Sequence, residues 1–343
     1  MSLLKDKLPV AVLFGGPSGE HDVSLASGKN IALALQESGF PILCVGIEKK
    51  EDNPQWREIP MEDLAKTTLD NPIDISALGS PIAPKDLAQK VKCAFPICHG
   101  PFGEDGELQS QLQNLKLPYV GTEPLGCSLS LDKAKTKEVI AQVPLAQTPF
   151  LVTTDPKFSF EEATAKLQLP LFVKPCAMGS SVGISRVTKV EEWQKAITLA
   201  FQHDNTIVIE QGLEGRELEC ALLETEQGLQ VSGIAEIVSH HDFYSYEAKY
   251  LDPKGAALIY PAKISEENKG KIQEAAKQAF RALKCRDYAR ADFFLTAKGE
   301  VIFNEINTHP GFTKISQFPS LCKHMGMSYG DLVSGMVLRA VRY

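Results

Sequence analysis

Several familiar signals are missing from this 343-residue sequence. No segment approaches the ~18 apolar residues that a membrane helix needs, so we predict no membrane insertion. The eight cysteines form no C-x-x-C pair and have no zinc-like spacing, so we expect free thiols and a reducing cytoplasmic location. The net charge is -7 and no long basic run occurs, which argues against nucleic acid as a partner.

Two common nucleotide-binding signatures are also absent. Gly15, Gly16 and Gly19, which follow the first apolar run, do not form G-x-G-x-x-G, so an NAD fingerprint is not supported. The loop from Gly179 to Gly183 has no G-K-[ST] and is not a Walker A motif. Its glycines and serines lie between two β-type segments, where they can form a plain hairpin turn or cover phosphates with backbone N–H groups. This local pattern leaves both readings open.

The bulk composition is that of an ordinary globular protein, with 43% hydrophobic and 23% charged residues. The chain is long enough for two or three domains. Residues 9–47 show a strand, helix and strand pattern, which predicts a βαβ unit and a parallel sheet. The first apolar run lacks the cleavage pattern of a signal peptide, so we interpret it as a buried first strand. Residues 49–90 are polar and rich in proline, and they predict little.

The rest of the chain alternates further helix and strand patterns. Ser265 can cap a helix over 265–284 that carries one apolar stripe. The tyrosine-rich stretch 240–261 has neither helical nor strand periodicity, which is typical of a functional loop or lid. We predict an N-terminal α/β domain at 1–122, a central subdomain at 123–210 and a C-terminal subdomain at 211–343. The other expected elements are strands at 93–100, 117–122, 171–175, 182–185, 206–211 and 216–224, and helices at 106–115, 128–142 and 158–168.

A hairpin is predicted over 289–311, where two apolar runs flank residues 298–299. If those two residues form the turn, Asp292 lies opposite Glu305 and Arg290 lies opposite Asn307. Opposed acids repel, so a cation should sit between them, and a set of oxygen donors suits Mg²⁺ or Mn²⁺ better than zinc. A three-residue turn with a glycine bulge would shift the pairing by one and split the acids. An ordinary exposed hairpin end remains the alternative.

Six motifs occur in the order and spacing of the ATP-grasp ligases, which this chain resembles over essentially its whole length. They are "SLDKAKTK", "KPCAMGSSVGIS", "VIEQGLEGRE", "YEAKY", "ARADFF" and "NEINTHPGFT". Two further motifs, "GGPSGEHDVSL" and "HGPFGEDGELQ", resemble signatures of the D-alanine–D-alanine ligase family in particular. The resemblance implies an ATP-grasp fold preceded by a parallel-sheet domain. It also implies ATP-dependent joining of two D-alanines through an acyl phosphate, for peptidoglycan precursor synthesis, in a cytoplasmic enzyme that is commonly a homodimer.

The resemblance also implies a nucleotide site and a metal site. Residues that match the family's ATP contacts are Lys133, Lys174, Gly179, Ser180, Ser181, Glu210, Gln211, Gly212, Leu213, Glu217, Lys249 and Phe294. Residues that match ligands of two Mg²⁺ or Mn²⁺ ions are Asp292, Glu305 and Asn307. Of these, the family pattern assigns the lysines and the glycine-serine loop to the phosphates, Glu210 to Leu213 to adenine, and Glu217 to the ribose.

The catalytic and substrate residues are implied in the same way. Glu20 matches the acid that receives the ammonium of the first D-alanine, and Ser180 and Tyr250 match its partners. Arg290 and the backbone N–H of Gly311 match the groups that stabilise the oxyanion. The other substrate positions are His99 for the first D-alanine and Ser316 and Gln317 for the second.

Two positions depart from the pattern, and two rival functions stay open. Gln317 replaces an expected apolar residue beside the second-substrate pocket, and His309 occupies a variable position. Ligases that use D-lactate or D-serine as acceptor would share every ATP and metal residue, but Lys249–Tyr250 resembles the amine-using form. A catalytically silent nucleotide-binding regulator is the rival from another class. The oxyanion group Arg290 argues against it, because a protein that only binds needs no such group.

Overall fold

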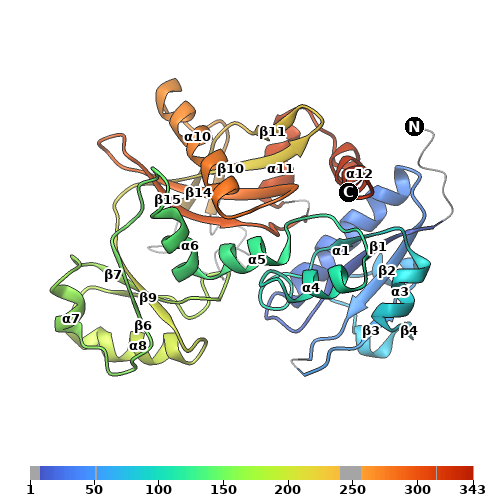
Figure 1. Cartoon of the computed structure of the whole chain (residues 1–343), viewed down its shortest axis with the longest axis horizontal. Helices are drawn as coiled ribbons and strands as arrows, with labels where there is room; N and C mark the ends of the chain where they lie inside the picture. Colours follow the sequence, from blue (N-terminus) through green and yellow to red (C-terminus); the bar gives the residue numbers. More distant parts are fainter. Residues whose placement is uncertain (1–7, 51, 240–255, 314, 343) are drawn as a thin grey trace.

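The computed structural model describes residues 8–50, 52–239, 256–313 and 315–342, which form three β-sheets with helices packed on them (Figure 1). Each sheet is built from one stretch of the chain, in sequence order. The arrangement confirms the predicted α/β and α+β fold class. Domain boundaries at residues 122 and 210 stay a prediction. Within the described part of the chain, no helix is both long and apolar enough to cross a membrane.

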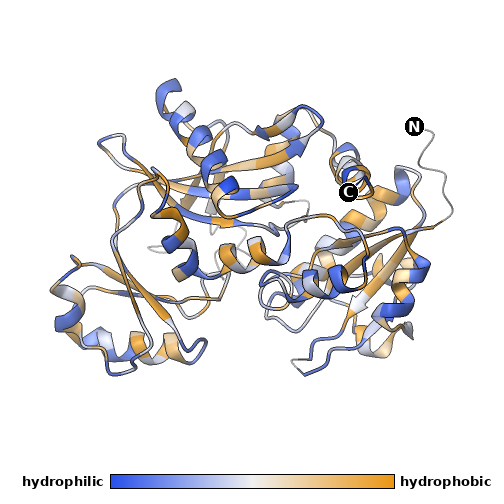
Figure 2. Ribbon diagram, viewed as in Figure 1, coloured by the Kyte–Doolittle hydropathy of each residue, from blue (hydrophilic) through white to orange (hydrophobic). Residues whose placement is uncertain are grey.

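The first sheet has three parallel strands at its centre, as the βαβ pattern predicts. Their side chains are almost entirely buried, as a parallel sheet between two layers of helices requires. In Figure 2 these strands are coloured hydrophobic, whereas helix faces at the surface are hydrophilic. Two short antiparallel strands from the region 49–90, which were not predicted, extend one edge. The strand order is β4 (Ser80–Pro81), β3 (Trp56–Glu58), β2 (Ile42–Ile47), β1 (Val10–Gly15) and β5 (Cys93–Pro96).

Four helices accompany this sheet, and one of them starts beside the site described below. The longest follows β1 directly, so Glu20 at its N-terminus lies just beyond the carboxyl end of a parallel strand. That edge is where open α/β sheets commonly bind ligands. The helices are α1 (His21–Glu37), α2 (Met61–Leu64), α3 (Pro84–Lys90) and α4 (Glu107–Asn114).

The second sheet is antiparallel and small. Its order is β6 (Phe150–Thr153), β9 (Ile207–Gln211), β7 (Leu171–Pro175) and β8 (Ser185–Val187), and the loop between β7 and β8 is the predicted glycine- and serine-rich loop. Helices α7 (Phe160–Thr164) and α8 (Trp193–Phe201) accompany it. Ser159 and Glu162 form a capping box at the start of α7, which satisfies backbone N–H groups at its N-terminus.

The third sheet, also antiparallel, carries the predicted hairpin on its edge. The hairpin is β14 (Tyr288–Leu295) and β15 (Val301–Asn307), and the sheet continues through β10 (Arg216–Thr225), β12 (Ala235–Ser239) and β13 (Ala256–Ile259), with β11 (Gly228–Val231) paired to β10. The predicted helix α10 (Glu266–Ala282) begins at Ser265, whose side chain accepts the N–H of Asn268, and packs its apolar stripe on this sheet.

The end of the chain returns to the first sheet. Helices α11 (Gln317–His324) and α12 (Tyr329–Ala340) follow the hairpin, and α12 packs on α1. Phe312 lies 5.9 Å, centroid to centroid, from Phe95 in an edge-to-face contact, within one buried cluster that unites both parts of the chain. The segment between β15 and α11 is thereby held between the first and third sheets.

Four predicted segments differ in the structure. The strand predicted at 182–185 is β8 at 185–187, and residues 256–259, within the predicted loop, form β13. The helix predicted at 128–142 is two helices, α5 (Pro124–Leu131) and α6 (Lys133–Ile140), because Asp132 leaves the helical conformation and accepts the N–H groups of Ala134 and Lys135 as the N-cap of α6. The strand predicted at 117–122 is reduced to one parallel bridge between Tyr119 and Ala94. All eight cysteines are free thiols.

Candidate active site

The three sheets converge on one cavity of about 470 Å³. Every predicted site residue that the structure describes lines it, although these residues come from all three parts of the chain. They are Glu20, His99, Lys133, Lys174, Gly179, Ser180, Ser181, Glu210, Gln211, Gly212, Leu213, Glu217, Arg290, Asp292, Phe294, Glu305, Asn307, Gly311, Ser316 and Gln317. Lys249 and Tyr250 lie outside the described residues. A second hollow of about 970 Å³, over Trp56 and Phe102, contains none of the predicted residues.

The hairpin pairs the residues as predicted, but its turn is longer than predicted and a bulge restores the register. Asp292 lies opposite Glu305, and Arg290 lies opposite Asn307. The turn, however, has three residues, 297–299, with a hydrogen bond from the Thr296 N–H to the Glu300 carbonyl at 3.0 Å. A bulge between Asp292 and Phe293 shifts the register by one and restores the pairing. The two-residue turn was therefore wrong, while the opposed acids were right, and bulges often re-aim side chains next to functional sites.

A third acid, which sequence reasoning missed, extends the row of opposed carboxylates. Glu219 on β10 lies opposite Asp292, so Glu219, Asp292 and Glu305 follow one another across three neighbouring strands. Glu219 is only 3% exposed. Its position two residues after Glu217 on a strand places both on one face, and that spacing was the available signal.

Arg290 is the cation that the described structure places against these acids. Its Nε and Nη2 donate to the two oxygens of Asp292 at 2.8 and 2.7 Å, and Nε lies 3.3 Å from Glu219 Oε2. Burial alone would lower the pKa of Arg290, but Asp292, Glu219 and Glu305 outweigh it and raise that pKa. The guanidinium is therefore charged and fixed beside the middle of the row.

The donor set fits hard divalent cations. Asp292 and Glu305 supply carboxylate oxygens and Asn307 supplies an amide oxygen, which are ligand types that Mg²⁺ prefers. The described residues include no preformed group of three or more His, Cys, Asp and Glu side chains arranged to hold a metal ion. A site that shares its ions with substrate phosphates needs fewer protein ligands, since Mg²⁺ is usually held by one or two carboxylates plus phosphate oxygens.

The loop between β7 and β8 has two consecutive residues with positive φ, a backbone conformation that can bind an anion. Ser180 and Ser181 have φ of 52° and 61°, a conformation uncommon for residues other than glycine. Lys133 lies at the start of α6, and its ammonium donates to the Met178 carbonyl in this loop. Burial lowers the pKa of Lys133, although the nearby Glu305 opposes that shift. Lys133 thus lies between the loop and the acidic hairpin, where phosphate would also lie.

Lys174 and Glu210 form a buried ion pair at the other end of the loop. Lys174 Nζ donates to Glu210 Oε2 at 2.9 Å, and a second lysine, Lys137, lies 3.3 Å from Oε1. Burial alone would raise the pKa of Glu210, but the two lysines outweigh it and lower that pKa to about 2. Lys137 was not predicted, although it lies one helical turn after Lys133 and so on the same face.

Aromatic side chains line the part of the cavity that includes Glu210. Phe172 and Phe294 line it together with the strand end from Gln211 to Leu213. Glu217 lies directly opposite Phe294 in the third sheet. The Gly212 N–H donates to the Pro170 carbonyl at 2.6 Å, which fixes this strand end. Such a slot suits a planar base with a polar neighbour for its sugar.

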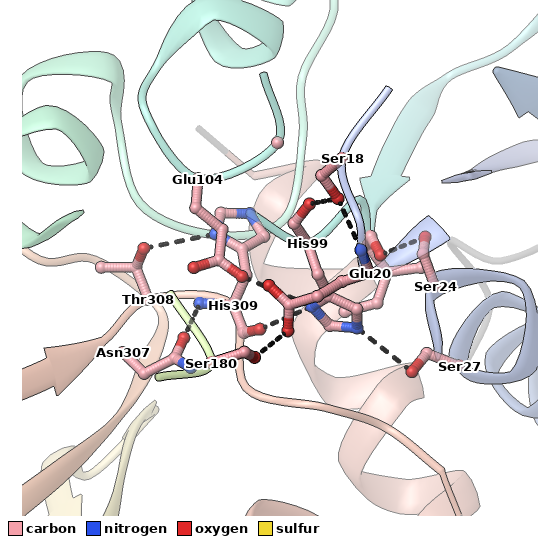
Figure 3. Close-up of polar contacts among 12 residues, drawn as sticks. Ser18, Glu20, Ser24, Ser27, His99, Glu104, Ser180, Asn307, Thr308 and His309 are labelled. Carbon is pink, nitrogen blue, oxygen red and sulfur yellow. Dashed lines mark hydrogen bonds and ion pairs between the residues drawn. The ribbon is translucent and has the colours of Figure 1, made fainter. Parts of the chain in front are cut away.

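Glu20 joins the first sheet to the loop between β7 and β8 (Figure 3). The Ser180 hydroxyl donates to Glu20 Oε1, although the two residues lie 160 positions apart. Ser18 accepts the Glu20 N–H at 3.1 Å and donates to the His99 carbonyl at 2.6 Å. The contact predicted between Glu20 and Ser180 is therefore present, and it closes the cavity on one side.

His99 is fully enclosed and paired with an acid that was not predicted. Its Nδ1 lies 3.5 Å from Glu104 Oε1 and 3.0 Å from the His309 carbonyl, and Ser27 Oγ lies 3.3 Å from Nε2. Burial would lower the pKa of His99, but Glu104 and Glu20 outweigh it and raise that pKa above the usual 6.5. Burial raises the pKa of Glu104, although His99 opposes the rise. This end of the cavity thus combines two acids, Glu20 and Glu104, with a histidine.

His309, the residue at the variable position, lies behind this pair. Its backbone N–H donates to Asn307 Oδ1 at 2.8 Å, and its Nε2 lies 3.2 Å from the Gln109 amide nitrogen. Gln109 also donates to the Gly103 carbonyl at 2.7 Å, which sets its amide nitrogen as the donor toward His309. Burial and the charge of His99 lower the pKa of His309 to about 3. His309 is accordingly neutral, with its proton on Nδ1.

The segment after Asn307 ends at the start of α11. The Ser316 hydroxyl accepts the Thr313 N–H at 3.0 Å, and Gln317 is the first residue of the helix. A Cβ on Gly311 would lie 2.8 Å from Ser316 Oγ, so a larger residue there would have to displace that hydroxyl. The backbone of Gly311 and the Ser316 hydroxyl are therefore adjacent on the cavity wall.

Comparisons with known proteins agree over nearly the whole chain. Two family models match, described as "D-ala D-ala ligase N-terminus" over residues 9–122 and "D-ala D-ala ligase C-terminus" over residues 139–338. D-alanine–D-alanine ligase A of Salmonella typhimurium is 41% identical over 350 residues, covering 96% of this chain and 95% of that protein. The corresponding ligase of Escherichia coli is 40% identical over 353 residues, covering 97% and 95%.

Two solved structures have the same fold. The VanG D-Ala:D-Ser ligase from Enterococcus faecalis superposes with a TM-score of 0.83 at 31% identity, covering 98% of this chain and 100% of that one. The D-alanine–D-alanine ligase from Coxiella burnetii superposes with a TM-score of 0.82 at 30% identity, covering 98% and 96%.

Proposed function

Because the chain belongs to the D-alanine–D-alanine ligase family, we propose that its cavity holds ATP and two D-alanines and that the residues lining it join them through an acyl phosphate. The activity is that of a D-alanine–D-alanine ligase (EC 6.3.2.4), which uses ATP and serves peptidoglycan synthesis. One observation carries the assignment of roles. Arg290, Asp292, Glu305 and Asn307 share the hairpin face that borders the same cavity as the Glu20–Ser180 contact.

The chemistry requires activation of a carboxylate. A carboxylate is a poor acylating agent because its leaving group would be oxide, so its oxygen first attacks the γ-phosphorus of ATP and ADP leaves. The amine of the second D-alanine then attacks the carbonyl carbon and loses a proton, and phosphate leaves with one oxygen of the original carboxylate. Arg290 and the Gly311 N–H donate to the oxyanion of the tetrahedral intermediate, which is the kind of preorganised stabilisation that dominates acyl transfer.

The first D-alanine lies at the Glu20 end of the cavity. Glu20 accepts a hydrogen bond from its ammonium group, and Ser180 keeps Glu20 in place while belonging to the phosphate loop. His99 contributes positive charge near the substrate carboxylate, because Glu104 and Glu20 raise its pKa. The substrate is thus oriented with its carboxylate toward the phosphate loop, which makes attack on the γ-phosphorus effectively intramolecular.

ATP extends from the apolar slot to the hairpin. Glu210 to Leu213 and Phe294 border adenine, Glu217 binds the ribose, and Lys133, Lys174 and the loop from Gly179 to Ser181 bind the phosphates. Asp292, Glu305 and Asn307 would hold two Mg²⁺ or Mn²⁺ ions, which supply neutralisation of charge on the triphosphate during transfer. The catalytic and cofactor assignments of Tyr250 and Lys249 remain part of this proposal.

The acceptor is D-alanine. Ser316 binds the carboxylate of the second D-alanine, and Gln317 flanks its side chain. The similarity to a solved ligase described as D-Ala:D-Ser makes D-serine the second candidate acceptor. Gln317 adds a polar group beside this pocket, which is the feature that favours D-serine. We also propose that the enzyme is cytoplasmic and acts as a homodimer.

Phosphate release from ATP and Mg²⁺ with a panel of amino acids tests the proposal. We expect release to depend on D-alanine and not on L-alanine, with D-alanyl-D-alanine identified by mass spectrometry. D-Alanine with ¹⁸O in its carboxylate should deliver one ¹⁸O atom to the released phosphate, because the acyl phosphate retains that oxygen. ATP binding without D-alanine-dependent release would favour a regulatory nucleotide-binding protein, and release without ¹⁸O transfer would contradict the acyl phosphate.

A further inference from the structure

Lys137 lies in the cavity and has no role in the reaction described above. Its side chain is 5% exposed, and its ammonium lies 3.3 Å from Glu210 Oε1 and donates to Thr148 Oγ1 at 3.2 Å. The Thr148 hydroxyl donates in turn to Glu210 Oε2 at 3.3 Å. The ammonium also lies over the Phe150 ring, 4.9 Å from its centroid. Several independent contacts therefore hold this lysine against one carboxylate.

Glu210 occupies a particular place in the second sheet. It lies on β9 between Phe150 on β6 and Phe172 on β7, at the apolar slot next to the strand end from Gln211 to Leu213. A planar heteroaromatic ring fits between apolar side chains, and a few polar groups then fix its orientation. An ionised carboxylate at such a slot accepts hydrogen bonds and donates none. It therefore favours a ring that presents an amino group.

Lys137 and Lys174 both pair with Glu210, but they differ in their other surroundings. Lys174 lies 2.9 Å from Glu210 Oε2, is 15% exposed and stands at the entry to the phosphate loop. Phosphates in that loop compete with Glu210 for this ammonium. Lys137 is more deeply enclosed, and its remaining contacts are to Thr148 and Phe150. A buried carboxylate that loses its cationic partners takes up a proton instead of remaining charged.

We propose that Lys137 determines the base selectivity of this cavity, because it keeps Glu210 an ionised acceptor for the 6-amino group of adenine while Lys174 serves the triphosphate. Lys137 is thus a positioning residue that acts through Glu210. The inference rests on the proposed function, because it requires the nucleotide base to lie beside Glu210. It deepens that function by naming the group that separates adenine from a purine without the amino group.

Equilibrium binding of two diphosphates tests the inference without turnover. ADP and purine riboside diphosphate differ only in the 6-amino group, so the ratio of their dissociation constants isolates its contact. By titration calorimetry, we expect the wild-type protein to prefer ADP by about 10- to 100-fold, as a charge-assisted hydrogen bond implies. Lys137→Gln keeps a polar side chain but removes the charge, and the preference should fall to a few-fold. Lys137→Arg should retain it.

Two further variants, at Lys135 and Glu210, provide a control and an independent test. Lys135 is on the same helix, is half exposed and pairs with Asp132, so Lys135→Gln should leave both affinities unchanged. Glu210→Gln presents a neutral acceptor and should reduce the preference as much as Lys137→Gln does. This second variant keeps the inference testable if Lys137→Gln does not fold.

Three results would overturn the inference. These are equal binding of both diphosphates by the wild-type protein, loss of the preference in Lys137→Arg, and an equal loss of both affinities in Lys137→Gln with the ratio preserved. The last result would assign Lys137 a purely structural role. A protein that prefers ADP as expected but releases no phosphate with D-alanine would contradict the proposed reaction and leave this inference standing. A protein that binds neither diphosphate would contradict both.

Discussion

Arg290 donates two parallel hydrogen bonds, of 2.8 and 2.7 Å, to the carboxylate of Asp292, which lies two residues away on the same strand. The pair joins the group assigned to the oxyanion and one proposed metal ligand. Bidentate geometry fixes the guanidinium plane as well as its position. Displacement of either residue should therefore shift the other.

Glu305→Gln should reduce turnover and leave the metal-free fold intact. Glu305 lies opposite Asp292 in a row of three acids, so removing one charge relieves repulsion. We expect turnover to fall at least about 10- to 100-fold, with the apparent affinity for Mg²⁺ weakened. Thermal unfolding with a chelator present should occur at the same temperature or higher, and a large decrease in that temperature would count against the assignment.

Glu219→Gln tests whether the third acid positions Arg290. Glu219 lies 3.3 Å from Arg290 Nε and is only 4% exposed at its side chain. Without its charge, Arg290 loses one of the three acids that hold it, Asp292 and Glu305 being the others, so we expect kcat to fall about tenfold while KM for ATP changes little. Glu226, which pairs with Arg342 at the surface, provides the control: Glu226→Gln should leave both constants unchanged. Equal changes in kcat and KM for Glu219→Gln would contradict a positioning role.

His309 should make the protein less stable in acid. Its folded pKa is about 3, below its ordinary 6.5, so between these values the unfolded chain binds the extra proton. The contribution of His309 is complete above about pH 6.5 and is lost as pH falls toward 3, by at most about 1.4 kcal/mol per pH unit. His309→Met, which cannot be protonated, should flatten the measured free energy of unfolding over this range.

The comparison is cleanest between pH 4.5 and 6.5. Glu210, whose pKa is lowered from 4.5 to about 2, adds its own loss of stability only below that range. His99 and Glu104 face His309, and their raised pKa values add pH dependence of the opposite sign in both proteins. The difference between wild-type protein and variant isolates His309. An identical pH dependence in both would show that His309 does not titrate this way.

Gln317 should affect the acceptor and not the nucleotide. It is the first residue of α11 and lines the cavity beside Ser316. Gln317→Met should change KM for the second D-alanine and the ratio of D-serine to D-alanine use, with KM for ATP unchanged, because the base slot is built from other elements. Steady-state kinetics with each acceptor would measure this. A change confined to ATP would show that the pocket is wrongly assigned.

Local patterns predicted much of the fold. The sequence predicted the parallel strands of the first sheet, the capped helix α10 and the hairpin, because apolar periodicity and capping residues act over short distances. The break at Asp132 was missed, since an apolar-polar pattern continues across it while the side chain caps the next helix. The opposed acids were predicted through an incorrect turn, and the bulge that corrects it has no clear sequence signal.

The sequence by itself determined the residue types of the site and, through motif order, the family. The face of a strand or helix on which a residue lies follows from periodicity, which is why the sequence could predict that Asp292 and Glu305 lie opposite each other. Only the tertiary structure decided that Glu219 joins their row, that Lys137 shares Glu210, and that His99 pairs with Glu104. The reason is physical: such contacts depend on how separate sheets pack, and packing is set by the summed burial of many side chains rather than by any short stretch of chain.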